Sequence, residues 1–272
     1  MVRSALADTP STVIPAKAGI HCFHQARVRM TALIDRGRMM KPTLPVRPFR
    51  VFALLAALVM SQAATAHGNR TEILAPGWGI LSYEAPAPGT YRLPPIMDAA
   101  DGRVLREDAT LANLFDLMGD RFVLLSFVYT RCTDVNGCPL ANAVFHLVRS
   151  RLKERPELAG AARLISMSFD PDNDTPEVMR AYGPLEDDSS VEWMLLTTRD
   201  RSDLEPILDG YGQYTLREYD HNGEYTGEFA HLLRVFLIDR ERRVRNIYST
   251  GFLHPDILMN DLETLLLESR SG

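Results

Sequence analysis

The segment FVLLSFVYTRCTDVNGCP, residues 122–139, is the most informative part of this chain. Residues 122–129 form a nearly continuous apolar and aromatic run, which is typical of a strand buried on both faces. Cys138 can then act as the N-cap of a helix, and Pro139 suits its first position. Cys132 and Cys138 therefore lie where a strand runs into a helix. Because such a joint aims side chains and helix amides at one point, two sulfurs there indicate disulfide chemistry or binding of a soft metal ion.

Strands and helices alternate along the chain around this segment. The helix after Cys138 has one apolar stripe, formed by Leu140, Val144, Leu147, Val148 and Leu152. Thr175 followed by Pro176 predicts the start of another helix. Further strands are predicted over 91–97, 162–169, 193–198, 232–238 and 244–248, and further helices over 108–118, 176–182, 202–210 and 255–268.

This order predicts one α/β domain of thioredoxin-like plan. Its centre is a mixed β-sheet, and helices cover both faces of the sheet. In that plan the reactive sulfur lies where the first core strand meets its helix. Cys132 and Cys138 hold the corresponding place here.

The first 66 residues are expected to lie outside this domain. Residues 40–66 have the pattern of a secretory signal peptide: basic residues, the uncharged run VFALLAALVM, and an Ala64-Thr65-Ala66 cleavage site. Residues 1–39 are expected to be an upstream extension, with translation starting at Met39 or Met40. Residues 67–90 are predicted to be an extended arm, and residues 91–272 the domain itself. We expect an exported, soluble periplasmic protein; the alternative is an inner-membrane anchor formed by an uncleaved signal.

The net charge differs between the first 66 residues and the part that is expected to be exported. The whole chain has 30 basic and 35 acidic residues. Residues 1–66 contain nine of the basic and two of the acidic ones, so the remainder carries 21 basic against 33 acidic residues, a net charge of −12. An acidic surface argues against nucleic acid and anionic lipid as partners. The membrane is expected to be reached only through a partner or an uncleaved signal.

Two cysteines remain once Cys22 is removed with the first segment. In an oxidising compartment, such a pair is either a structural staple or a working dithiol. A nearby imidazole would complete a three-ligand site for copper, which prefers sulfur and nitrogen. Among the five histidines after residue 66, His231 stands out because it precedes the strand LLRVFLID. In a thioredoxin-like sheet that strand end lies beside the reactive helix tip, although a single histidine there is more often structural.

Three ordered motifs give the chain a family resemblance. VLLSFVYTRC…CP, SMSFDPDNDTPEVMRAYG and AHLLRVFLID resemble the Sco/SenC family of copper-binding assembly proteins for cytochrome c oxidase. The resemblance covers about residue 91 to the end. It implies Cys132, Cys138 and His231 as ligands of a copper ion, Cu(I) or Cu(II), and Asp134 as a residue that tunes the cysteines. It also implies a partner, the copper-bearing subunit of a terminal oxidase.

The chain departs from the family pattern at three places. The cysteines are usually spaced C-x3-C, whereas Val135, Asn136 and Gly137 lengthen the segment here to C-x5-C. Thr133 replaces the common proline, and Leu232 follows the histidine where a small polar residue is common. Asn136-Gly137 can form a tight turn, so the two sulfurs are still expected to converge.

Other functions use the same residues or weaker signals. The main alternative is an enzyme, a thiol–disulfide oxidoreductase with Cys132 and Cys138 as its redox pair, which keeps the oxidase cysteines reduced and is itself served by a periplasmic thiol reductant. A disulfide that only staples the loop is a third interpretation. Residues 170–174 imitate the start of a calcium loop but lack its later ligands, so we interpret Asp170, Asp172 and Asp174 as solvated acids before a capped helix.

Overall fold

The computed structural model describes residues 72–184 and 190–271. The chain divides into two units, Met1–Asn69 and Arg70–Gly272, and every described residue belongs to the second. The predictions made for residues 1–66 therefore lie outside the described residues. Among the helices of the described part, none is long and apolar enough to cross a membrane.

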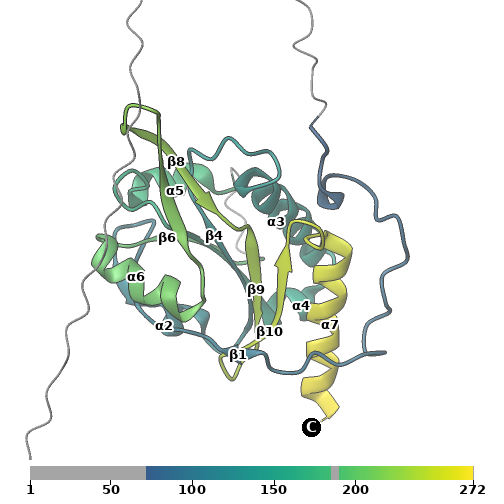
Figure 1. The fold of residues 1–272 in the computed structure, drawn as a ribbon. Coiled ribbons are helices and arrows are strands. Elements are labelled where there is room, and N and C mark those ends of the chain that lie inside the picture. Colours follow the sequence, from purple (N-terminus) through teal and green to yellow (C-terminus); the bar gives the residue numbers. More distant parts are fainter. Residues whose placement is uncertain (1–71, 185–189, 272) are drawn as a thin grey trace, which may run out of the picture. The chain divides into compact units, whose positions relative to one another are not determined.

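An eight-stranded mixed sheet forms the centre of the second unit (Figure 1), in the order β1-β10-β9-β4-β5-β6-β2-β3. The strands are β1 (Met97–Asp98), β2 (Arg103–Arg106), β3 (Leu111–Asn113), β4 (Phe122–Val128), β5 (Ala162–Ser168), β6 (Trp193–Thr197), β9 (Arg234–Ile238) and β10 (Arg243–Ser249). The pairs β4–β5 and β5–β6 are parallel, and the other neighbours are antiparallel. The predicted central mixed sheet is confirmed.

The central strands are buried on both faces, as their continuous apolar sequences predict. Every residue of β4 and of β5 is buried. The two strands pair in parallel without a register shift, with Leu125 opposite Ile165. Strand β4 lies between β5 and β9, and its carboxyl end, which leads to the cysteines, stays paired with β5 up to Val128 opposite Ser168.

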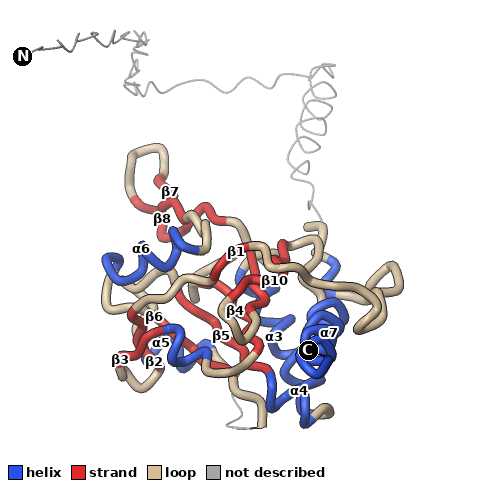
Figure 2. The backbone as a smooth tube through the Cα atoms, turned by 90° about the horizontal axis from the view of Figure 1, so that it is seen from below, coloured by secondary structure: helices blue, strands red, loops and turns tan. Residues whose placement is uncertain are grey.

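Helices cover both faces of the sheet. They are α2 (Leu114–Met118), α3 (Cys138–Lys153), α4 (Pro156–Ala161), α5 (Pro176–Tyr182), α6 (Arg201–Gly210) and α7 (Pro255–Ser271), with a 3-10 turn η1 (Pro76–Trp78). Helices α3, α4 and α7 pack together, as Figure 2 shows. Phe145 of α3 meets Trp193 on one face of the sheet, with ring centroids 5.7 Å apart. Tyr211, just after α6, meets Phe127 on the opposite face at 5.4 Å.

A separate two-stranded hairpin carries the histidine toward the cysteines. It consists of β7 (Thr215–Tyr219) and β8 (Tyr225–His231), joined by a turn at residues 220–223. Gly223 has a φ of +81°, a left-handed conformation that glycine adopts without strain. The hairpin has its own register, in which Thr215 lies opposite His231.

Several boundaries differ from the sequence prediction. The strand expected over 91–97 is only β1, and the helix expected over 108–118 is β3 followed by the short α2. Strand β2 was not predicted. Leu147, assigned to the apolar stripe of α3, is 47% exposed. The start of α5 is confirmed, because the Thr175 side chain accepts a hydrogen bond from the backbone N–H of Val178.

The interpretation of the acidic loop before α5 as solvated is wrong for two of its three aspartates. Asp170 and Asp174 are 1% and 0% exposed. Asp174 accepts hydrogen bonds from the Thr130 backbone N–H, the Thr130 hydroxyl and the Ser168 hydroxyl. Asp170 pairs with Arg131 at 3.0 Å. These carboxylates bind Thr130 and Arg131, just after the end of β4, and Ser168 at the end of β5, so they support the loop that carries Cys132.

Candidate metal centre

Cys138 is fixed at the start of α3. It is the first residue of the helix and is 0% exposed. The N-cap position, which was predicted for Cys138, is therefore taken by the preceding residue, Gly137. The backbone N–H of Tyr129 points at the Cys138 sulfur, with 3.4 Å between N and Sγ. One sulfur is therefore held between the end of β4 and the first turn of α3, as the sequence pattern predicts.

Cys132 lies on the loop between β4 and α3 and is half-buried. Its backbone N–H donates to the Tyr129 carbonyl at 3.3 Å, which turns the chain just after the strand. Its Sγ faces the Asp134 carbonyl at 4.0 Å. The loop then closes with a hydrogen bond from the Gly137 N–H to the same carbonyl, at 2.9 Å. This turn confirms that the C-x5-C segment can bring its two sulfurs together.

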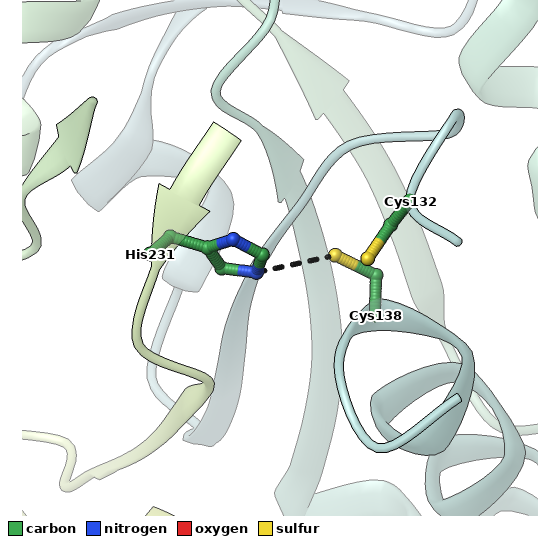
Figure 3. A group of neighbouring side chains, drawn as sticks. All are labelled: Cys132, Cys138 and His231. Carbon is green, nitrogen blue, oxygen red and sulfur yellow. Dashed lines mark hydrogen bonds between the residues drawn. The ribbon is translucent and has the colours of Figure 1, made fainter. Parts of the chain in front are cut away.

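His231 completes the group from the far side (Figure 3). It is the last residue of β8, and its Nε2 lies 3.7 Å from the Cys138 sulfur. Its Nδ1 lies 3.1 Å from the Phe229 carbonyl. Because a carbonyl only accepts, Nδ1 carries the proton, and the Nε2 lone pair is left facing the sulfurs. A ring nitrogen fixed in this way by a backbone carbonyl is the usual support of a metal-binding histidine.

Aromatic rings hold the imidazole in this orientation. The ring centroids of Tyr129 and Phe169 lie 5.5 Å and 5.0 Å from that of His231. Phe229 packs against both of these aromatic rings. Tyr129 and Phe127 are buried, as predicted. The cluster excludes water from one side of the imidazole, while half-buried Cys132 leaves the other side of the group accessible.

The three potential ligand atoms lie within 4.8 Å of one another. In residues 72–184 and 190–271 this is the one group of three or more histidine, cysteine or acidic side chains with that property. The other histidines in this part of the chain lie elsewhere. His146 is exposed beside Trp193, His221 is exposed in the hairpin turn, and His254 accepts from the Asp256 N–H at the start of α7.

The comparisons with known proteins agree with this arrangement. The SCO1/SenC family model matches residues 111–267, which is more than half of the chain. The chain belongs to the SCO1/SenC family. No curated protein matches it in sequence.

Solved structures share the fold of this SCO1/SenC protein. Apo Sco1 from Thermus thermophilus is 25% identical, with a TM-score of 0.51 over 65% of this chain and 95% of its own. A SCO1/SenC family lipoprotein from Bacillus anthracis is 23% identical, with a TM-score of 0.51 over 62% and 95%. Arabidopsis thaliana ScoI with copper bound is 17% identical, with a TM-score of 0.49 over 64% and 99%. The Thermus thermophilus and Bacillus anthracis structures confirm the thioredoxin-like fold.

The pKa values of the two thiols of this SCO1/SenC protein are shifted in opposite directions. The Cys138 thiol donates toward the Cys132 sulfur and, with nearby backbone amides and His231, lowers the pKa of Cys132 to about 6. The same contact, together with burial, raises the pKa of Cys138 well above its usual range. Near neutral pH the pair therefore holds one thiolate, on the more accessible sulfur, and one proton, on the buried sulfur.

This asymmetry predicts selective alkylation. At pH 7 the metal-free, reduced protein is expected to react with iodoacetamide at Cys132 at least about tenfold faster than at Cys138, because the thiolate is the nucleophile. The rate at Cys132 should fall as the pH drops through about 6. Replacing Cys138 by alanine removes the donor and should move this inflection upward. Peptide mapping by mass spectrometry gives both rates, and equal labelling at pH 7 would contradict the assignment.

The structure shows the surroundings of the residues that differ from the family pattern. Thr133, in place of the common proline, donates its hydroxyl to Glu228 of β8 at 2.9 Å and so links the cysteine loop to the strand of His231. Leu232 is 64% exposed. The Asp134 carboxylate accepts the Asn136 N–H at 2.9 Å, so its contact is with the turn, while its backbone carbonyl faces the Cys132 sulfur. A tuning role for Asp134 stays a prediction.

Sequence reasoning missed the groups that orient the ligands. The Phe229 carbonyl fixes the His231 tautomer, and the Arg131–Asp170 pair supports the residue before Cys132. Neither has a distinctive sequence signal, because a backbone carbonyl has no side-chain identity and an Arg–Asp pair 39 residues apart depends on the fold. The Asn136-Gly137 turn was predicted, but its contacts with the arm were not.

Proposed function

We propose that this SCO1/SenC protein binds one copper ion through the Cys132 and Cys138 thiolates and the His231 imidazole. The observation that carries the proposal is the meeting of these three ligand atoms within 4.8 Å, with Nε2 turned toward the sulfurs. Two thiolates and one imidazole suit copper better than hard cations, which prefer oxygen. Membership in a family associated with copper binding and oxidase assembly supports the choice of copper over zinc.

The proton changes that accompany copper binding follow from the pKa shifts of Cys132 and Cys138. Cys132 already carries negative charge near neutral pH, whereas Cys138 must lose its proton when copper binds. When the ring proton is on Nδ1, facing the Phe229 carbonyl, Nε2 of His231 offers its lone pair to the metal. Loading requires the dithiol, since a disulfide would remove both sulfur ligands. Copper bound here is cargo, and half-buried Cys132 is the ligand that a receiving protein would reach first.

The proposed client is the copper-bearing subunit of a terminal oxidase, reached outside the cytoplasm. The signal-like residues 40–66 support export, with the periplasm as the site of action. Transfer would proceed by ligand exchange: a client thiolate or imidazole takes the place of Cys132, and Cys138 leaves last.

Copper titration of the reduced protein against a chromophoric Cu(I) chelator tests the proposal. We expect one tightly bound copper per chain, and an affinity about a hundredfold lower for His231→Ala, since even groups that only support ligands contribute 10- to 100-fold. His146→Ala is the matched control, because His146 is exposed and lies away from the sulfurs. Absence of binding by the reduced wild type, or equal affinities for both variants, would refute the proposal.

A second candidate function, a thiol–disulfide oxidoreductase, is favoured by one observation. A reactive, half-buried Cys132 beside a buried, protonated Cys138 is the arrangement of an attacking and a resolving thiol. The Cys132 thiolate would attack a client disulfide and form a mixed disulfide. Cys138 would then displace the client thiol, and an external thiol reductant would restore the dithiol. A reduction potential near that of thioredoxin, about −270 mV, would support this function.

A further inference from the structure

The loop between the two cysteines is held from outside by the arm that precedes the domain. The Asn136 side chain uses both ends of its amide: Oδ1 accepts from the Ala75 backbone N–H at 2.7 Å, and Nδ2 donates to the Ile73 carbonyl at 2.8 Å. The Trp78 indole N–H donates to the Val135 carbonyl at 3.2 Å. These three hydrogen bonds fall on Val135 and Asn136, inside the C-x5-C segment that is two residues longer than the usual C-x3-C.

The arm is itself anchored to the core. Gly77 is buried, and a Cβ added there would lie 2.2 Å from the Leu253 carbonyl and 3.0 Å from Leu140 of α3. Only glycine permits such a close approach. The His254 ring lies beyond it: Nδ1 accepts from the Asp256 N–H, so Nε2 carries the proton and donates to the Gly79 carbonyl at 3.1 Å. Segment 73–79 therefore links the cysteine loop to α3 and to the start of α7, so that the loop is held relative to these helices.

The anchored part of the loop lies directly against a sulfur. A Cβ added to Gly137 would lie 3.1 Å from Cys132 Sγ. The Asn136 backbone N–H is held by the Asp134 carboxylate, and that of Gly137 by the Asp134 carbonyl. A shift of Asn136 therefore moves the turn on which Cys132 rests. Cys138 would not follow, because it is buried in α3.

We propose that Asn136 is a positioning residue: by fastening the cysteine loop to segment 73–79, it sets the separation of the Cys132 and Cys138 sulfurs. It does not touch the metal or the reacting atoms. As far as copper is concerned, the inference rests on the proposed function. For the dithiol and disulfide couple it stands alone, because holding one thiol beside the other raises its effective concentration and favours the disulfide.

Asn136→Ala tests this role, with Asn260→Ala as the matched control. Asn260 lies on α7 and also holds the arm, since its Nδ2 donates to the Pro86 carbonyl at 2.9 Å, but it does not bind the cysteine loop. All variants are made in the Cys22→Ser background, so that only the two site cysteines react. Copper affinity is measured by chelator competition. The redox couple is measured by equilibration with a dithiol/disulfide reference compound, whose disulfide takes two electrons and two protons from the protein and becomes the dithiol.

For Asn136→Ala we expect copper affinity about tenfold lower and a disulfide about tenfold less favoured, which corresponds to a potential about 30 mV less negative. Asn260→Ala should stay within about twofold in both measurements. If Asn136→Ala does not fold, Trp78→Phe decides, because it keeps the ring and removes the hydrogen bond to Val135; about threefold changes in the same direction are expected.

Two results would overturn the inference. One is that Asn136→Ala leaves both the copper affinity and the disulfide equilibrium unchanged. If Asn136→Ala does not fold, the same result for Trp78→Phe would overturn it. The other is an equal change in Asn260→Ala, which would show that any loosening of the arm has this effect. A wild type that binds no copper refutes the proposed function instead. The disulfide equilibrium then still decides the role of Asn136.

Discussion

Replacing Cys138 by alanine is expected to lower copper affinity by more than about a thousandfold. Cys138 supplies one of the two sulfurs and is the most rigidly held ligand, because it is fully buried at the start of α3. Loss of a supporting group around a metal typically costs 10- to 100-fold, and loss of a thiolate ligand itself costs more. The substitution also removes the donor that stabilises the Cys132 thiolate.

Stability separates loss of the ligand from loss of the fold. Cys138→Ala removes one buried sulfur atom, so we expect it to lower the free energy of unfolding by only about 1–2 kcal/mol. His146→Ala, an exposed position on the same helix α3, is the control and should leave the affinity unchanged. Chelator competition gives the affinity, and urea unfolding gives the stability. A Cys138→Ala protein that is folded and binds copper within tenfold of wild type would contradict the site.

Replacing Asp174 by alanine is expected to lower the free energy of unfolding by about 3–5 kcal/mol. Its carboxylate is fully buried and accepts hydrogen bonds from the Thr130 N–H, the Thr130 hydroxyl and the Ser168 hydroxyl. Each buried donor left without a partner costs about 1–3 kcal/mol. Because Thr130 lies two residues before Cys132, the variant should also weaken the positioning of Cys132.

Asp172→Ala is the matched control in the same loop. Asp172 is exposed and pairs with the surface residue Arg217. Exposed ion pairs contribute about 0–1 kcal/mol, so this variant should be nearly as stable as wild type. Chemical unfolding of both variants, followed by far-UV circular dichroism, checks the difference. Equal stabilities would show that the burial of Asp174 has no energetic consequence.

The core could be predicted from sequence because its patterns are local and strong. Strand β4 and helix α3 carry unmistakable apolar runs and stripes, so the joint that holds Cys132 and Cys138 follows directly from them. His231 could be selected because it precedes an apolar strand whose place in a thioredoxin-like sheet is known. It proved to be the last residue of a separate strand, β8, which was not among the predicted strands.

The remainder depends on contacts between distant segments. Strand β2 has only four residues and is stabilised by pairing with β3 and β6, so its own sequence signal is weak. Asp174 resembles any loop acid until the fold places Thr130, 44 residues earlier, beside it. Asn136 reads as a turn residue, and its partners Ile73 and Ala75 lie more than 60 residues away, in an arm without periodicity. Such pairs become visible only in three dimensions.

The X-ray absorption spectrum of the copper-loaded protein reports which atoms are bound to the metal, and so shows whether His231 and the two cysteines hold copper together. We predict two sulfurs and one imidazole nitrogen bound to the metal in wild type, and loss of the imidazole signal in His231→Ala but not in His146→Ala. A wild-type spectrum without imidazole, or one that His231→Ala leaves unchanged, would contradict the claim that His231 joins the two cysteines in holding copper.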